Sequence, residues 1–172
     1  WTRVFGVNVQ SPFFLTVALL PLLDVAAKSS DAARVINIGS IAGLRPQNVE
    51  ATAYDSIDTT VYDVSKGAVH HLTRVMSAKL ARRPNGGHIL VNAIAPGLVP
   101  SKMSKGIALV TDSSFDELAA HIPIQRFGYE HDMAGLAIFL ASRGSGWITG
   151  EVIASDGGHV YATETAMGPA KL

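Results

Sequence analysis

The chain contains no cysteine among its 172 residues, which excludes disulfide bonds and thiolate metal sites. Charge is scarce as well, because only 16% of the residues are charged and fourteen basic side chains balance fourteen acidic ones. Since no basic block occurs, we expect neither nucleic acid nor a membrane surface as a partner. The lack of cysteine fits a reducing compartment, so we expect a cytoplasmic location.

The sequence also lacks a long uninterrupted apolar run. The most apolar segment, 12–27, contains Pro21 and Asp24 and is shorter than the roughly 20 residues of a spanning helix. We therefore expect a buried helix over 2–27, apolar on nearly all sides, of the kind that lies between a sheet and another subunit.

Metal-binding patterns are missing too. The six histidines are scattered, and none of their spacings suits zinc. His70 and His71 are neighbours in a predicted helix and point in different directions. We predict no metal site.

Short β-branched runs alternate with longer helical segments along the chain. The predicted strands cover 34–39, 88–95 and 151–156. The predicted helices cover 2–27, 61–83 and 132–142, with short helical pieces over 102–109 and 114–121. Strands that alternate with helices of this length indicate parallel pairing and an α/β layered fold.

Tyr62 and Lys66 stand at the start of the predicted 61–83 helix, four residues apart. In a helix this spacing puts both side chains on one face. At about 4 Å and an effective dielectric of about 20, the ammonium would stabilise the phenolate by about 4 kcal/mol. Such a phenol can act as a general acid. The same spacing is common on solvated helix surfaces, so the pair alone leaves both interpretations open.

Further candidates follow the predicted strands, where open α/β sheets bind ligands. Ser40 comes directly after the first strand, and Pro96-Gly97 ends the second. Each also has a structural interpretation: Ser40 as a turn residue, Pro96-Gly97 as a strand terminator, and Asn8 as a partner of backbone groups.

Five short motifs follow one another along the chain. They are Trp1-x-x-Val4-x-x-Val7-Asn8, Asn37-Ile-Gly-Ser40-Ile-Ala-Gly43, Tyr62-x-x-x-Lys66, Asn92-Ala-Ile-Ala-Pro96-Gly97 and the segment 150–158. With these motifs the chain resembles the short-chain dehydrogenase/reductase family over nearly its whole length. The resemblance implies a Rossmann-like doubly wound parallel sheet and an NAD(P)-dependent oxidoreductase that interconverts a carbonyl and a secondary alcohol.

The resemblance also implies a role for each site residue. Tyr62 would be the general acid/base, and Lys66 would stabilise its phenolate and bind the nicotinamide ribose. Ser40 would donate to the substrate carbonyl oxygen, and Asn8 would hold a water that connects Lys66 to solvent. The cofactor pocket would be formed by Tyr62, Lys66, Pro96, Gly97, Val99 and Ser101. The segment 101–125, including Met103 and Ile107, would cover the substrate as a lid.

The main departure from the family is the absence of a Gly-x-x-x-Gly-x-Gly turn after a strand, the usual binding site of the cofactor pyrophosphate. The nearest match, 144–150, follows a predicted helix and is rejected. The resemblance therefore implies one partial domain, 1–172, whose sheet is incomplete because the first strands and helices are missing. The strand 34–39 would then present an open edge.

A second departure is an expanded loop over about 40–61. It contains Tyr54, a rival to Tyr62 as the acid, but its partner four residues later is Asp58, whose charge would disfavour a phenolate. Tyr62 is therefore the predicted acid.

Substrate and partners are implied only by the resemblance. Segments 92–97 and 99–104 look most like reductases of the 3-oxoacyl type, and the cofactor would be NAD(P), with NADP slightly favoured. A homo-oligomer is expected through the helices 2–27 and 62–83. The alternative is a non-catalytic truncated member of the family that retains only these oligomerisation surfaces.

Overall fold

The computed structural model describes residues 1–46, 59–102, 104–105 and 114–162. Within these residues three strands form one parallel sheet, in the order β1, β2, β3. Their bounds are β1 Ala33–Ile38, β2 Ile89–Pro96 and β3 Val152–Ser155. The register pairs Ala33 with Ile89 and Ala93 with Val152. The predicted parallel α/β architecture is confirmed.

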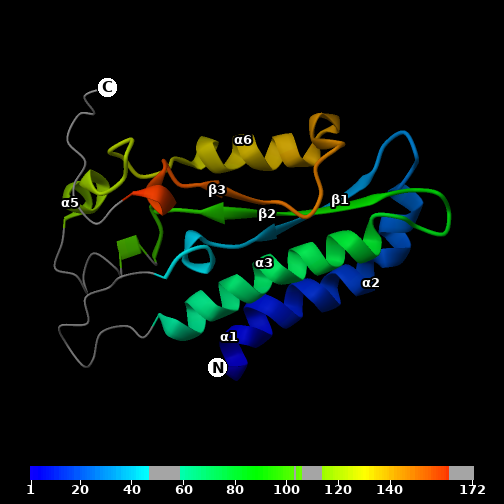
Figure 1. Cartoon of the computed structure of the whole chain (residues 1–172), viewed down its shortest axis with the longest axis horizontal. Coiled ribbons are helices and arrows are strands. Elements are labelled where there is room, and N and C mark those ends of the chain that lie inside the picture. Colours follow the sequence, from blue (N-terminus) through cyan, green and yellow to red (C-terminus); the bar gives the residue numbers. More distant parts are fainter. Residues whose placement is uncertain (47–58, 103, 106–113, 163–172) are drawn as a thin grey trace.

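Helices cover both faces of the sheet. The long N-terminal helix comprises α1 (Thr2–Phe5), the π-helical segment η1 (Gly6–Gln10) and α2 (Ser11–Ala26). The others are α3 (Thr60–Leu80), α5 (Phe115–Ala120) and α6 (Glu130–Ala141), with short 3-10 turns η2 (Ile41–Gly43), η3 (Arg143–Ser145) and η4 (His159–Tyr161). Figure 1 shows α2 and α3 on one face, α6 on the other, and all three strands pointing toward the end that carries α5.

The core lies between β2 and helix α3. Seven consecutive residues of β2, from Ile89 to Ala95, are buried, as expected for a central strand with neighbours on both sides. Met76 of α3 packs with Ile89 and Val91 of this strand and with Ala27 and Ala33. This packing fixes α3 along the sheet, and with it the side chains near its N-terminus.

Strand β1 has an open edge. Among the described residues it pairs with β2 alone, and Ile38 at its carboxyl end is 57% exposed. The carboxyl end of β1 is therefore accessible from its unpaired side, next to the N-terminal turns of α3 (Figure 1).

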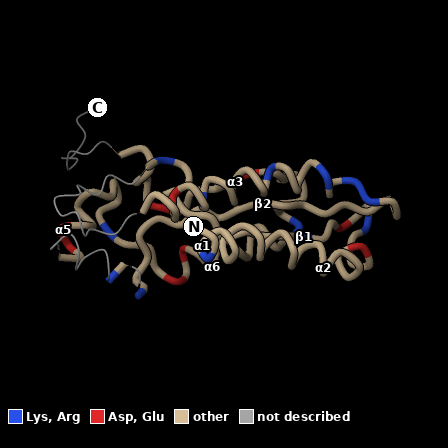
Figure 2. The backbone as a smooth tube through the Cα atoms, turned by 90° about the horizontal axis from the view of Figure 1, so that it is seen from below, with Lys and Arg blue, Asp and Glu red and all other residues tan. Residues whose placement is uncertain are grey.

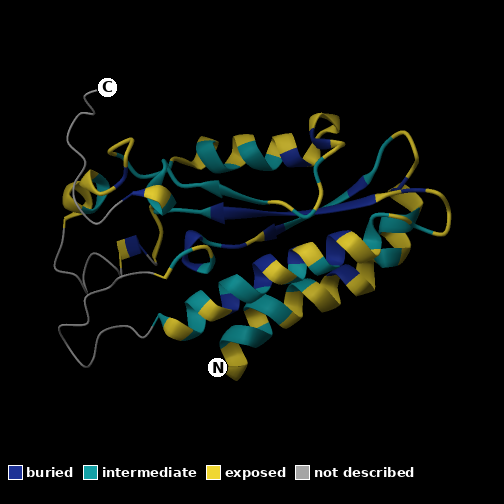
Figure 3. Ribbon diagram, viewed as in Figure 1, coloured by how far each residue is buried: buried dark blue, intermediate teal, exposed yellow. Residues whose placement is uncertain are grey.

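The N-terminal helix differs from its prediction in two respects. It spans Thr2–Ala26, so by length and composition it could cross a membrane, and the argument from the shorter run 12–27 is wrong. Within this chain Thr16 is the buried residue of α2, so the chain alone does not provide the burial expected for this helix. An apolar helix that lies beside α3 on the same face of the sheet exposes its far side unless another surface covers it (Figure 3).

Candidate active site

Tyr62 and Lys66 lie on the first turns of α3, beside the carboxyl end of β1. The Lys66 Nζ donates to the Ile38 carbonyl at 3.0 Å and lies 5.5 Å from the centre of the Tyr62 ring. Burial lowers the pKa of the Lys66 ammonium. The predicted pair therefore shares one helix face, with the cation near the ring.

Ser40 occupies the turn that connects β1 to η2. Its Oγ accepts the Ala42 N–H at 3.2 Å, and its own backbone N–H donates to His70 Nε2 at 3.4 Å. The preceding Gly39 N–H donates to the Ile94 carbonyl at 2.7 Å, which ties the turn to β2. Because the Ser40 Oγ accepts a backbone hydrogen bond, its O–H can donate to a ligand.

Asn8 lies in the π-helical segment η1, a geometry that often occurs at functional sites. Its Nδ2 donates to Ser65 Oγ at 2.9 Å, and Ser65 Oγ donates to the Tyr62 carbonyl at 2.7 Å. Ser65 is completely buried. It fixes the amide of Asn8 against α3, so the Asn8 Oδ1 remains as the acceptor end.

Pro96 and Gly97 end the neighbouring strand β2. The Gly97 N–H donates to the Ser155 carbonyl at 3.0 Å, and a Cβ at this position would lie 2.6 Å from the Cβ of Asp156. Only glycine fits such a close approach between two chain segments. The strand therefore ends in a turn packed against the end of β3.

Val99 and Ser101 follow this turn. The ideal Cβ at Gly128 would meet Val99 Cγ2 at 3.2 Å, which places Val99 against the segment before α6. Ser101 Oγ accepts the Ser104 N–H at 3.1 Å, and Ser104 Oγ accepts the Ser101 N–H at 2.7 Å. Ser101 is thus held by local hydrogen bonds, whereas Val99 is held by its contact with a distant segment.

The structure brings the predicted catalytic residues together at one place. Hydrogen bonds connect Asn8 to the Tyr62 turn, Lys66 to the end of β1, and Ser40 to α3. The predicted cofactor residues of the β2 turn lie at the adjacent strand end, and Gly39 connects the two strand ends. Tyr54, Asp58, Met103 and Ile107, and with them most of the expanded loop and part of the lid, lie outside the described residues.

Two residues that pattern reasoning missed take part in this arrangement, Ser65 and His70. Ser65 stands inside the Tyr62–Lys66 motif, and the i, i+4 spacing from Lys66 to His70 is visible in the sequence. Their partners, Asn8 and the Ser40 turn, come from distant segments, so only the fold reveals these contacts.

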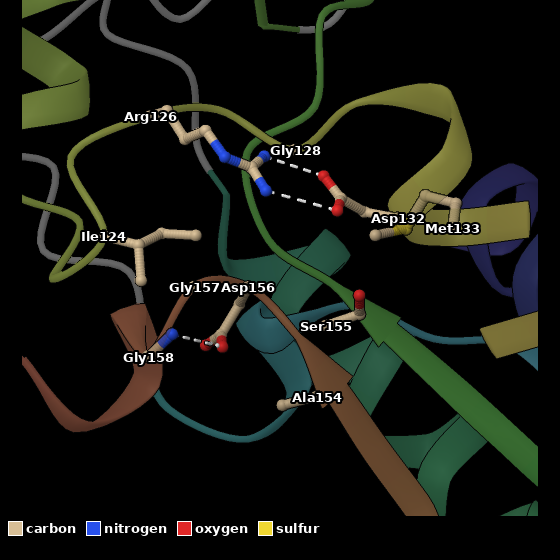
Figure 4. Close-up of a pocket in the computed structure, with 10 residues that line it drawn as sticks. All are labelled: Ile124, Arg126, Gly128, Asp132, Met133, Ala154, Ser155, Asp156, Gly157 and Gly158. Carbon is tan, nitrogen blue, oxygen red and sulfur yellow. Dashed lines mark hydrogen bonds and ion pairs between the residues drawn. The ribbon is translucent and has the colours of Figure 1, made fainter. Parts of the chain in front are cut away.

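A separate cavity of about 260 Å³ opens at the carboxyl end of β3 (Figure 4). It is lined by Ile124, Arg126, Gly128, Asp132, Met133, Ala154, Ser155, Asp156, Gly157 and Gly158. Arg126 binds Asp132 through two hydrogen bonds of 2.7 and 3.2 Å, which lowers the pKa of that carboxyl to about 2. Asp156 accepts the Gly158 N–H at 2.9 Å. Arg126 and Asp132 are thus paired with each other, Asp156 is held by backbone N–H groups, and none of the predicted catalytic residues lines the cavity.

In the part of the chain that the structure describes, no group of three His, Asp or Glu side chains could hold a metal ion.

Comparison with known proteins gives matches over most of this chain. A family model described as enoyl-(acyl carrier protein) reductase matches residues 1–160. The rhamnolipids biosynthesis 3-oxoacyl-[acyl-carrier-protein] reductase of Pseudomonas aeruginosa is 41% identical over 158 residues, which cover 92% of this chain and 57% of that protein. The short-chain dehydrogenase/reductase PhomF of Diaporthe leptostromiformis is 33% identical, over 96% of this chain and 54% of that protein.

A solved structure gives the same result for the fold. The complex of Pseudomonas aeruginosa RhlG with NADP at its active site superposes with a TM-score of 0.78 at 40% identity, over 93% of this chain and 57% of that one. The sheet described above is therefore part of a Rossmann-like fold, as predicted. The chain spans somewhat more than half the length of the curated relatives that it matches.

Proposed function

This chain belongs to the short-chain dehydrogenase/reductase family, and on that premise we propose that it is an NAD(P)-dependent oxidoreductase with Tyr62 as its general acid/base. The reaction interconverts a carbonyl and a secondary alcohol. The observation that carries the proposal is a set of hydrogen bonds around the N-terminal half of α3, which carries Tyr62. They join Asn8 to Ser65, Lys66 to the end of β1, and the Ser40 turn to His70.

Each of these side chains has a distinct task. Tyr62 gives its phenolic proton to the carbonyl oxygen of the substrate and takes it back in the reverse direction. The Lys66 ammonium, 5.5 Å from the centre of the phenol ring, stabilises the phenolate that remains. Ser40 donates its O–H to the same substrate oxygen, where negative charge develops.

Asn8 supports proton supply. Since Ser65 holds its Nδ2, the Asn8 Oδ1 is left to accept a hydrogen bond from a water that connects Lys66 to solvent. This series of hydrogen bonds, from Lys66 through the water to solvent, restores the proton that Tyr62 loses in each turnover.

The donor set fits the nicotinamide end of the cofactor. The Lys66 ammonium has three donors, and one of them goes to the Ile38 carbonyl, so two are left for ribose hydroxyls. The turn from Pro96 to Ser101, at the adjacent strand end, would line the ring. When bound, the reduced nicotinamide supplies the hydride that reduces the carbonyl carbon. NADP is favoured, because the similar RhlG structure holds NADP.

The substrate class follows from the most similar relatives. A 3-oxoacyl thioester is proposed, since a protein 41% identical to this chain is named a 3-oxoacyl-[acyl-carrier-protein] reductase. Its 3-keto group is the carbonyl that Tyr62 and Ser40 would polarise.

A homo-oligomer through the helices 2–27 and 62–83 is part of the proposal. Seven large apolar side chains of α2 are exposed, namely Phe13, Phe14, Leu15, Val17, Leu19, Leu22 and Val25. A second subunit would remove this surface from water.

The test is the reduction of a 3-oxoacyl thioester by the full chain at millimolar NADPH. Weak cofactor affinity is expected, because the proposed cofactor residues would contact only the nicotinamide end. Tyr62→Phe should lower the rate roughly 10²–10⁴-fold, the usual contribution of a general acid. Tyr161→Phe, at an exposed tyrosine, is the matched control and should keep the rate. Equal rates in wild type and Tyr62→Phe would refute the proposal.

The exposed α2 face favours one alternative, a non-catalytic subunit that keeps only its association surface. In that case the wild-type chain would form a defined oligomer in analytical ultracentrifugation, yet would neither bind NADPH nor reduce the thioester. Turnover that depends on Tyr62 would exclude this alternative.

A further inference from the structure

His70 is a buried titratable residue that the proposed mechanism leaves without a task. It lies one helical turn beyond Lys66, so Tyr62, Lys66 and His70 share one face of α3. Its side chain is 98% buried, since the residue is only 2% exposed. The side chain is buried between α3 and the turn after β1, so its neighbours fix its position.

The turn that carries Ser40 is shaped around the imidazole ring. A Cβ at Gly39 would lie 2.2 Å from His70 Nε2, and a Cβ at Gly43 would lie 2.8 Å from its Cε1. Between these two glycines, the Ser40 N–H donates to Nε2 at 3.4 Å. The ring therefore fills the space under the turn, and the glycines are the residues that allow it to do so.

The chemistry of the ring follows from these contacts. Burial is the main cause that lowers the pKa of His70, and the positive charges of Arg74 and Lys66 lower it further. An interaction with the Gly43 backbone acts in the opposite direction and raises it. A neutral imidazole has one N–H and one acceptor nitrogen. Because Nε2 receives the Ser40 N–H, the proton belongs on Nδ1, which has no well-formed hydrogen bond to any described residue.

We propose that His70 is a positioning residue, a neutral imidazole protonated at Nδ1 whose Nε2 holds the Ser40 backbone N–H and so sets the Ser40 hydroxyl relative to Tyr62. The inference rests on the function proposed above, because it gives His70 a role in placing that hydroxyl. His70 acts through Ser40 and does not touch the substrate.

Two further contacts along the same helix support this placement. Lys66 Nζ binds the Ile38 carbonyl at 3.0 Å, and Asn37 Nδ2 donates to Thr73 Oγ1 at 2.9 Å. Together with His70, they connect successive turns of α3 to three positions between Asn37 and Ser40. The helix that carries the acid thus fixes the end of β1 and the first residue of the following turn.

The first test reads the ring directly and needs no activity. Long-range proton–nitrogen correlation spectra of the nitrogen-15-labelled full chain at neutral pH should show His70 protonated at Nδ1 and unprotonated at Nε2, with the peak assigned by its loss in His70→Met. A ring protonated at Nε2, or on both nitrogens, would overturn the proposal.

The second test compares two substitutions of similar length. In His70→Gln the side-chain oxygen can take the place of Nε2 as acceptor, whereas His70→Met offers no comparable acceptor. The Ser40 amide proton should exchange with solvent roughly tenfold faster in His70→Met than in wild type, the effect of one lost hydrogen bond, and His70→Gln should restore slow exchange. His71→Gln, at the exposed neighbour, is the control and should change nothing.

The kinetic test separates positioning from general damage. His70→Met should lower kcat roughly tenfold with little change in KM, and His70→Gln should recover most of that loss. In a Ser40→Ala background, His70→Met should lower kcat no further. An equal loss in both backgrounds would show that His70 does not act through Ser40. If wild type shows no turnover, the proposed function fails, while the spectra and the amide exchange still decide the role of His70.

Discussion

Two surfaces of the same pair of helices are built in opposite ways. Where α3 faces the end of β1, polar groups find partners within the chain, as in the contact of Asn37 with Thr73 and of the Ser40 N–H with His70. The outer side of α2 instead exposes apolar side chains (Figure 3). Figure 2 shows that the N-terminal helix, from α1 to α2, is also nearly free of charge, with Arg3 and Asp24 as its charged residues.

The contrast separates the part of the structure that the chain stabilises by itself from the part that needs a second surface. Buried polar groups without partners are costly, so a network with its hydrogen bonds made holds one geometry. On the α3 side such hydrogen bonds hold Lys66 to Ile38 and the Ser40 backbone to His70 within the chain itself. The exposed apolar side chains of α2 contribute to stability only when another surface covers them.

The largest expected effect comes from disturbing the close contact of η2 with α3. A Cβ at Gly43 would lie 2.5 Å from the Lys66 carbonyl carbon and 2.6 Å from the Gly67 nitrogen, both backbone atoms that cannot turn aside. We expect Gly43→Ala to lower the free energy of unfolding by about 2–3 kcal/mol, measured by urea denaturation.

Gly135 in α6 provides the matched control for this substitution, because a Cβ there meets no atom within 4 Å. Gly135→Ala should raise the free energy of unfolding by up to about 1 kcal/mol through helix propensity. Equal effects of the two changes would mean that η2 does not pack against α3 as described.

A smaller effect is expected from the contact that orients Asn8. Ser65→Ala removes the acceptor of the Asn8 Nδ2 and should lower the free energy of unfolding by about 1–2 kcal/mol. In a double-mutant cycle with Asn8→Ala, the two changes should be coupled by roughly 1 kcal/mol. Strict additivity would contradict the hydrogen bond.

The pH dependence of stability tests the buried imidazole. The folded protein binds a proton at His70 only at a lower pH than the unfolded chain, whose histidine titrates near about 6.5. The stability that neutral His70 contributes is therefore full above about pH 6.5 and is lost as the pH falls toward the folded pKa. His159, whose pKa is also lowered by burial, adds to the slope in the same direction.

Chemical unfolding measured between pH 7.5 and 5.5, roughly the range in which histidine titrates, should thus show wild type losing stability toward acid. In His70→Met the free energy of unfolding should depend less steeply on pH. The pH dependence that remains should be the contribution of His159. An unchanged slope would mean that His70 titrates alike in the folded and unfolded chain.

The smallest expected effect on folding belongs to the outer side of α2. Leu22 is 68% exposed, so Leu22→Gln should change the free energy of unfolding of the monomer by less than about 0.5 kcal/mol. Leu20, which packs against the core, is the matched position, and Leu20→Gln should cost several times more. Sedimentation should show weaker self-association for Leu22→Gln, whereas unchanged association would contradict a role for this face.

The sequence was sufficient for the parts of the molecule that depend on local pattern. The β-branched runs predicted β1, β2 and β3 to within a few residues, and the Tyr62–Lys66 spacing predicted a shared helix face. Alternation of strands and helices predicted the parallel sheet.

Features that depend on distant segments were not predictable in this way. The contacts of His70 with the Ser40 turn and of Ser65 with Asn8 join residues 30 and 57 positions apart. The exposure of α2 also escaped prediction, because an apolar helix has the same composition whether the chain itself or another surface covers it.

The central claim is that the end of β1 and the start of α3 form the site of carbonyl reduction. It is tested most directly by incubating the full chain with a 3-oxoacyl thioester and NADPH that carries deuterium at both C4 positions. The product of wild type should contain deuterium on the new carbinol carbon, and the product should be almost absent with Tyr62→Phe. A wild-type product without deuterium there, or equal product from Tyr62→Phe, would contradict the account.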